Sequence, residues 1–187
     1  MRIRANSAVA AMLVVLSMPA CGQTVTLAEL DGALVRASAS FQNRVLWNGK
    51  EIWNNSRTDW TITIGSRGAG HAEWSTTVQD ARGSRTSAPR SGSFTVGQPR
   101  ETASLRGGHV LWAFDSGVLT MLQTYRIGGF KISIAFARTA GALTCTIRAF
   151  NAREVGAGNI RRKSAFGGDF ELIGATATGS TCRVDKG

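Results

Sequence analysis

Hydrophobic and polar residues alternate with a period of two along most of the chain, and a helical period is nearly absent. The clearest run covers residues 130–138, whose apolar positions are Phe130, Ile132, Ile134 and Phe136. Shorter runs with the same alternation occupy residues 33–42, 60–64, 72–78, 94–96, 110–114, 118–125 and 143–149. Such runs are typical of strands with one buried face, so the pattern predicts an all-β protein of about ten strands.

Short turns separate many of these runs. Asn48-Gly49 is the strongest two-residue hairpin signal. Later turns are expected at Asp115-Ser116-Gly117, Gly128-Gly129 and Ala140-Gly141. Turns this tight join antiparallel neighbours, because parallel strands need a long crossover. Residues 109–151 are therefore predicted to form a four-strand meander, which favours an antiparallel up-and-down β-barrel of calyx-like shape. The alternative is a two-sheet β-sandwich.

The rest of the chain supplies two strands and two loops. Terminal strands are expected at 170–173 and 181–184. Residues 80–92 and 151–169 are polar, basic and interrupted by glycine, which is typical of long surface loops.

The N-terminus has the pattern of a secretory signal peptide. Arg2 and Arg4 precede the uncharged apolar run Ala8–Leu16, and a small-residue cleavage zone ends at Gly22. The run is too short to span a bilayer of about 30 Å as a helix, so no transmembrane segment is expected in the mature chain. We therefore expect residues 1–22 to be removed and 23–187 to form one exported domain, periplasmic or secreted. Cleavage before Cys21, giving a lipoprotein, is the alternative.

The cysteine count predicts one disulfide. Either cleavage leaves Cys21 removed or lipidated, so Cys145 and Cys182 remain. Two cysteines in an oxidising compartment usually pair. The chain has no C-x-x-C sequence, so a structural role is expected rather than a redox-active one.

The chain is strongly basic. Its formal net charge is +10, and 18 of its 22 basic residues are arginine. One interpretation is that the high number of arginines reflects GC-rich codon usage. The other is a surface for anionic polymers, because guanidinium groups pair with carboxylate and phosphate. The two predicted loops would supply this anion-binding rim through Arg82, Arg85, Arg90, Arg161, Arg162 and Lys163. Export argues against a specific nucleic-acid partner.

Five tryptophans are a high number for this length. Trp60, Trp74 and Trp112 fall on alternating apolar faces and are expected to face inward, either as core residues or as the lining of a site for a small apolar or amphipathic ligand. A third possibility is an exposed stacking platform for sugars or bases. Trp53, which is followed by Asn54-Asn55-Ser56, is expected to be the most exposed tryptophan.

Motifs for catalysis, metals or cofactors are absent from the sequence. His71 and His109 have no metal-ligand spacing, and no serine has the context of a nucleophile. If a carboxylate pair were catalytic, Glu154 and Glu73 would be the first candidates. We therefore expect a non-enzymatic, cofactor-free exported β-barrel that binds a small apolar ligand. The alternative is a cell-envelope protein that binds anionic polymers through its basic loops.

Overall fold

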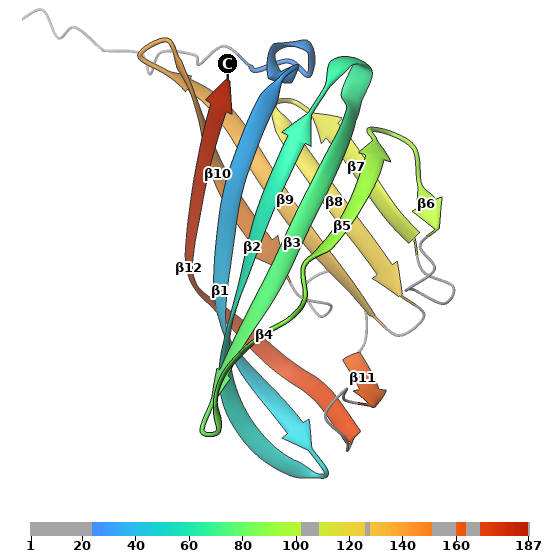
Figure 1. The fold of residues 1–187 in the computed structure, drawn as a ribbon, viewed down its shortest axis with the longest axis vertical. Coiled ribbons are helices and arrows are strands. Elements are labelled where there is room, and N and C mark those ends of the chain that lie inside the picture. The colour runs from blue at the N-terminus through green and yellow to red at the C-terminus, as the bar shows by residue number, and fades with distance from the viewer. Residues whose placement is uncertain (1–23, 102–108, 126–127, 151–159, 164–168, 187) are drawn as a thin grey trace, which may run out of the picture.

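The protein folds into two antiparallel sheets that pack face to face (Figure 1). The computed structural model describes residues 24–101, 109–125, 128–150, 160–163 and 169–186. The all-β prediction is confirmed. Neither sheet closes into a barrel, so the sandwich alternative describes the architecture. No helix in the described part of the chain is long and apolar enough to cross a membrane.

The larger sheet has seven strands in the order β11-β12-β1-β2-β3-β4, with β5 also paired to β3. The short 3₁₀ turns η1 (Ala28–Leu30) and η2 (Ser66–Gly68) lie outside it. Its strands are β1 (Ala33–Trp47), β2 (Lys50–Ile64), β3 (Ala69–Asp80), β4 (Gly83–Thr86), β5 (Arg90–Thr95), β11 (Ile160–Lys163) and β12 (Asp169–Lys186).

The smaller sheet has five strands in the order β10-β9-β8-β7-β6. Its strands are β6 (Arg100–Glu101), β7 (His109–Asp115), β8 (Val118–Tyr125), β9 (Gly128–Thr139) and β10 (Ala142–Phe150). The last four pair in chain order, which confirms the predicted meander. The predicted turn at Gly128-Gly129 is wrong. Both glycines belong to β9, because their backbone continues the ladder opposite Tyr125 and Thr124.

The tight turns follow from backbone geometry. Asn48 and Gly49 connect β1 to β2 and have φ values of 48° and 76°. Positive φ at both central residues gives the turn a twist that matches the twist of the two strands. Ser116-Gly117 and Ala140-Gly141 repeat this pattern at the two described turns of the meander. The hairpin predicted at Asn48-Gly49 is thus confirmed.

The two predicted loops contain strands. Residues 80–92 include β4 and the start of β5, which pair with different halves of β3. Residues 151–169 include β11, which pairs with β12. The two predicted terminal strands are one continuous strand, β12. An exposed strand edge leaves backbone N–H and C=O groups without partners, and these short strands satisfy part of that requirement along β3 and β12.

The main core lies between the two sheets. Its fully buried members include Val35, Ile62, Leu119, Ile132 and Ile134, which come from both layers. Ring stacking crosses this layer, as in the contact between Trp60 of β2 and Phe130 of β9, whose centroids are 6.2 Å apart. The alternating positions identified in the sequence therefore form the contact between the layers.

A disulfide joins the two sheets at one edge. Cys145 of β10 is bonded to Cys182 of β12, and their Cα atoms are 5.5 Å apart. The predicted bridge is confirmed, and it links the edge strand of the meander to the long C-terminal strand. A disulfide is compatible with an oxidising compartment.

Part of the larger sheet extends beyond the smaller one, and we call it the distal half. It comprises residues 41–57, the β3–β4 hairpin at 77–86, β11, and 169–177 of β12. Register shifts between Ser40 and Phe41 and between Arg44 and Val45 leave two residues of β12 unpaired with β1. Such bulges bend a strand and increase its twist. In Figure 1, β12 changes direction there, and the distal half projects below the meander.

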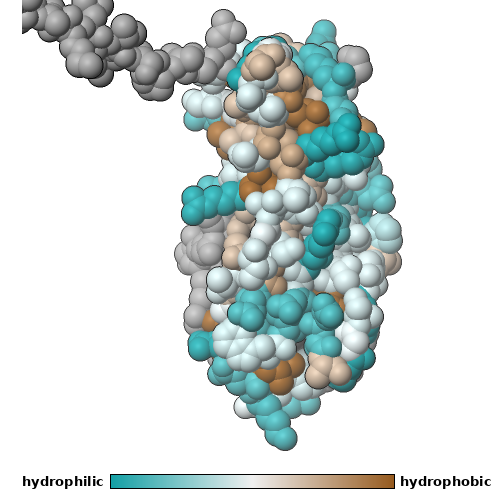
Figure 2. All heavy atoms as spheres, turned by 90° about the vertical axis from the view of Figure 1, so that its left-hand side faces the viewer, coloured by the Kyte–Doolittle hydropathy of each residue, from teal (hydrophilic) through white to brown (hydrophobic). Residues whose placement is uncertain are grey.

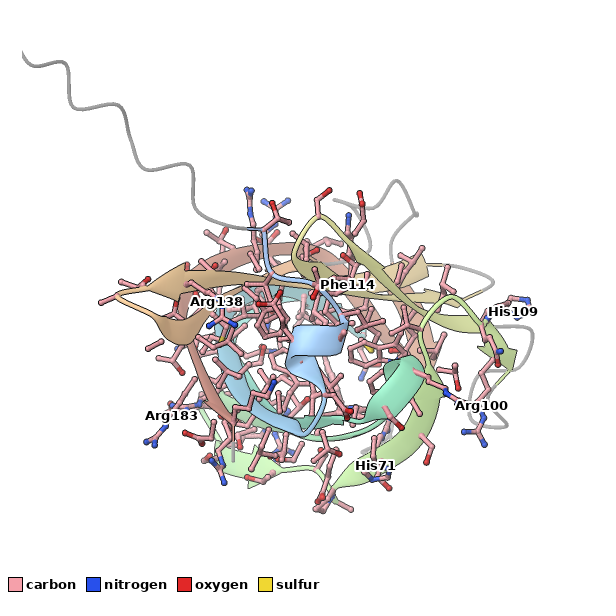
Figure 3. The ribbon with its side chains drawn as sticks, turned by 90° about the horizontal axis from the view of Figure 1, so that it is seen from above. His71, Arg100, His109, Phe114, Arg138 and Arg183 are labelled. Carbon is pink, nitrogen blue, oxygen red and sulfur yellow. A yellow bond between two sulfur atoms is a disulfide. The ribbon has the colours of Figure 1, made fainter. Side chains whose placement is uncertain are left out.

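The opposite end of the sandwich is covered by the N-terminal segment. Val25 and Leu30 are buried in the main core. Glu29 accepts a 2.7 Å hydrogen bond from Nη2 of Arg138, and Nζ of Lys186 donates to the carbonyl oxygen of Glu29. Figure 3 looks onto this end, where η1 lies across the sandwich and Arg138 points toward it. A hydrogen bond from the Thr26 backbone, aided by Arg138, lowers the pKa of Glu29 to about 2.

Removing the bridge should destabilise the fold. We expect Cys145→Ser with Cys182→Ser to lower the free energy of unfolding by about 3–4 kcal/mol, because the closed loop restricts the unfolded chain. Urea denaturation followed by far-UV circular dichroism measures the change. An unchanged midpoint, or rapid thiol labelling of the native parent protein, would contradict this assignment.

The Glu29 contacts should make the stability of the parent protein depend on pH. The folded pKa lies below the ordinary value of 4.5, so the carboxylate stabilises the fold above that pH and loses this effect as the pH falls toward about 2. Glu29→Gln should therefore melt at a lower temperature than the parent at neutral pH, and the difference should shrink on acidification. Thermal melts across this range test the prediction, and a constant difference would refute it.

Candidate functional site

The β3–β4 hairpin holds two arginines against one carboxylate. Asp80 ends β3, and its Oδ2 accepts a 2.6 Å hydrogen bond from Nη2 of Arg85 and a 3.1 Å bond from Nη2 of Arg82. Its Oδ1 accepts a 2.8 Å bond from the Arg82 backbone. The Asp80 side chain is only 10% exposed. A nearly buried carboxylate thus fixes both guanidinium groups at the tip of the hairpin.

An aromatic ring supports one of these arginines. The guanidinium carbon of Arg82 lies 5.3 Å from the ring centroid of Trp47, the last residue of β1. β2 lies between β1 and β3 in the sheet, so Arg82 reaches over β2 from the hairpin. Lys50 pairs with Trp47 across the β1–β2 turn and is exposed. We call Trp47, Lys50, Asp80, Arg82 and Arg85 the cationic cluster.

The electrostatics of the cluster keep it positive. The pKa of the Asp80 carboxyl group is lowered, mainly by the hydrogen bond from the Arg82 backbone. The side chains of Arg82 and Arg85 lower this pKa further. Asp80 therefore remains ionised in all but strongly acidic solution. The cluster's one carboxylate, two guanidinium groups and Lys50 together have a formal charge of +2. The Trp47 ring lies within cation–π distance of the Arg82 guanidinium, which also donates to Asp80.

A polar band separates this cluster from the main core. On the same face of the sheet, Nδ2 of Asn43 donates to Oδ1 of Asn54 at 2.9 Å and to Oγ of Ser56 at 2.8 Å. Beyond the band, Val45 is fully buried although it does not belong to the main core. The amide hydrogen bonds thus link the strands that carry Trp47 and Lys50.

The predicted anion-binding residues are divided among the β3–β4 hairpin, β5 and β11. Arg82 and Arg85 come together at the β3–β4 hairpin, whereas Arg90 begins β5 and pairs with Trp74 on the other half of β3. Arg161, Arg162 and Lys163 lie in β11, opposite Glu171, Phe170 and Asp169 of β12. β4 and β11 are opposite edge strands of the distal half. Basic segments therefore border the distal half on both sides.

The tryptophans predicted to face inward lie in or against the main core. Trp60 and Trp112 are each 3% exposed, and Trp112 stacks on Phe94 with ring centroids 4.2 Å apart. Trp74 is half-buried and packs against the same core. Their role in binding a small apolar ligand remains a prediction. Trp53 is 55% exposed, which confirms the expectation that it is the most exposed tryptophan.

The candidate catalytic residues do not form a site within the described residues. Glu73 is exposed on β3, and Glu154 lies outside the described residues. Nδ1 of His71 is 3.4 Å from Oγ of Ser93, and His109 is exposed at the start of β7. No group of three or more possible metal ligands occurs in the part of the chain that the structure describes. The expectation of a non-enzymatic protein stays a prediction.

Sequence reasoning missed three members of the cationic cluster. Trp47 and Lys50 flank the Asn48-Gly49 turn, so the hairpin signal itself placed them side by side. Asp80 is the first residue of the predicted loop at 80–92, and Arg82 and Arg85 follow it closely. An acidic residue followed closely by two arginines in a polar segment is a weak sequence signal for this arrangement.

No protein-family model, curated protein or solved structure matches the chain.

Two substitutions of Asp80 should separate its roles. Asp80→Asn keeps an oxygen that can accept the Arg82 backbone bond but loses the charge, whereas Asp80→Ala loses both. Hydrogen exchange measured by mass spectrometry should be faster over residues 80–86 in the alanine variant than in the asparagine variant, and slowest in the parent. Exchange in the meander should not change. Equal exchange in all three proteins would show that Asp80 does not organise the hairpin.

Proposed function

We propose that the protein is an exported, non-enzymatic cell-envelope protein that binds anionic polymers at its distal half. The observation that carries this proposal is the arginine pair held by Asp80, with Arg82 stacked on Trp47. Because these contacts already order both arginine side chains, binding costs less side-chain entropy than it would for free surface arginines.

The chemistry of the cluster suits carboxylate, sulfate or phosphate groups along a chain. Guanidinium presents several N–H donors in a plane and pairs with such groups through two parallel hydrogen bonds. Lys50 adds a charge at the neighbouring hairpin, and β11 contributes a basic segment at the other edge of the sheet. A polymer carries many anionic groups along one chain, so several of them can bind to separate cations of the distal half at the same time.

The expected compartment supports this class of partner. The signal-peptide pattern at 1–22 predicts export, and the Cys145–Cys182 bridge is compatible with an oxidising location. Anionic polymers are abundant in the bacterial envelope, and a positively charged exported protein meets them there. The predicted periplasmic or secreted location belongs to this proposal.

The other binding hypothesis makes a different prediction. A small apolar or amphipathic ligand held beside Trp60, Trp74 and Trp112 would be bound by burial of apolar surface. Such binding does not weaken as salt rises, whereas pairing by exposed cations does. Salt dependence therefore distinguishes the two functions.

Binding to a charged polymer should require the arginine pair. We expect the protein to bind dextran sulfate at low salt, with affinity that falls steeply as sodium chloride is added. Arg82→Gln with Arg85→Gln should weaken binding roughly tenfold, equivalent to about 1.4 kcal/mol. Isothermal titration calorimetry over a salt series measures both effects.

The matched control removes two positive charges from the opposite end of the molecule. Arg67 lies in η2, and Arg183 points outward at the end shown in Figure 3. Arg67→Gln with Arg183→Gln has the same net charge as the test variant and should bind nearly as well as the parent. Equal weakening by both pairs would indicate only non-specific attraction, and binding unaffected by salt would contradict the proposal.

A further inference from the structure

The outer face of the distal half carries a row of uncharged polar side chains. Cross-strand pairing aligns one residue from each of five neighbouring strands, β4, β3, β2, β1 and β12. We call these residues the polar row: Ser84, Gln79, Asn55, Gln42 and Thr176. All five are exposed. Since neighbouring strands lie about 4.8 Å apart, the row spans roughly 19 Å.

The side chains of the polar row are not engaged within the described part of the protein. Elsewhere on the sheet, polar side chains pair with each other, as Thr58 does with Thr76 at 2.9 Å and Thr77 with Thr86 at 2.9 Å. Within the described residues, no side-chain hydrogen bond involves the amides of Gln42, Asn55 or Gln79. Each amide offers both N–H donors and a carbonyl acceptor to a partner from outside.

An exposed indole lies beside the row. Trp53 is the only large hydrophobic side chain that is exposed among the described residues. It precedes Asn55 by two positions in β2, so the two side chains lie on the same face of the sheet. Across β1 and β12, the Trp53 position continues as Arg44 and then Gly174, which has no side chain. A flat aromatic surface therefore adjoins a line of donors and acceptors.

Charge is balanced on this face, unlike in the cationic cluster. Nε of Arg44 lies 3.8 Å from Oε1 of Glu51, and Nε of Arg57 lies 2.9 Å from Oδ1 of Asp59. These pairs flank the polar row on its two sides along β1 and β2. Figure 2 shows the side of the molecule on which β12 and β10 lie in Figure 1, and there hydrophilic and intermediate residues cover most of the lower part, with small hydrophobic patches between them. A charged partner would gain little here.

We propose that the outer face of the distal half binds an uncharged glycan chain. A sugar ring has an apolar C–H face, which stacks on an indole, and a rim of hydroxyl groups, which donate to and accept from amides. Trp53 supplies the stacking surface, and the polar row supplies the hydrogen bonds along a chain of several rings. A nucleic acid would also stack on Trp53, but its phosphates need unpaired cations, which this face lacks among its described side chains.

This inference does not rest on the polymer-binding function. The cationic cluster and the polar row occupy opposite faces of the same strands, because successive residues of a strand point to opposite sides. Arg82→Gln with Arg85→Gln should therefore leave glycan binding intact, and changes at Trp53 should leave binding to dextran sulfate intact.

The test uses the mature protein and neutral polysaccharides. Affinity electrophoresis in gels containing soluble hydroxyethyl cellulose, laminarin or xylan should show retardation of the parent by at least one of them, unchanged by salt. Trp53→Ala should weaken this retardation at least tenfold. Because Trp53 is more than half exposed, the variant should keep the parent's circular dichroism spectrum and melting temperature.

A second variant keeps the proposal testable if the first is poorly folded. Gln42→Ala with Asn55→Ala removes two amides from the polar row without touching the indole, and it should also weaken retardation. Two results would overturn the proposal: no retardation by any of the three glycans, or retardation that neither variant changes. Self-association of the parent that is lost in Trp53→Ala would identify a second copy of the chain as the occupant instead.

Discussion

Burial of apolar side chains between two sheets of unequal strand length determines the rest of the structure. β1 and β2 each have 15 residues and β12 has 18, whereas the meander strands have 7 to 12. The smaller sheet therefore covers only part of the larger one, and most of the fully buried residues lie where both layers are present. The distal half extends past the smaller sheet, and its outer face is exposed along the polar row. Both proposed sites lie on this uncovered part.

The edges of the sandwich are secured in different ways. The Cys145–Cys182 bridge fastens β10 to β12, and η1 covers one end through Leu30 and the contacts of Glu29. The bulges between β1 and β12 lie between the covered and uncovered parts of the sheet, and they allow the distal strands to bend away from the meander. The scaffold is therefore held firmly at one end and presents an open surface at the other.

The two faces of the distal half differ in how their charges are paired. On one face a single carboxylate, Asp80, holds two arginines, and the three side chains together have a formal charge of +1. On the other, Arg44 and Arg57 each have an acidic partner, and uncharged amides lie between them. Because strand residues alternate between faces, one short set of strands can present a cationic surface and a neutral one without interference. The arginines of one face thus form a positively charged cluster, whereas those of the other face are neutralised by acidic partners.

The sequence by itself determined the all-β class, the meander of 109–151, the Asn48-Gly49 hairpin, the pairing of the two cysteines and the exposure of Trp53. These depend on local signals, namely period-two alternation, turn residues and cysteine count. Only the tertiary structure decided between barrel and sandwich, placed β4 and β11 in segments expected to be loops, and brought Arg82 over Trp47. Those outcomes depend on which strand edges remain unpaired and on the relative lengths of the two sheets. Such quantities belong to residues far apart in the chain, and no local pattern encodes them.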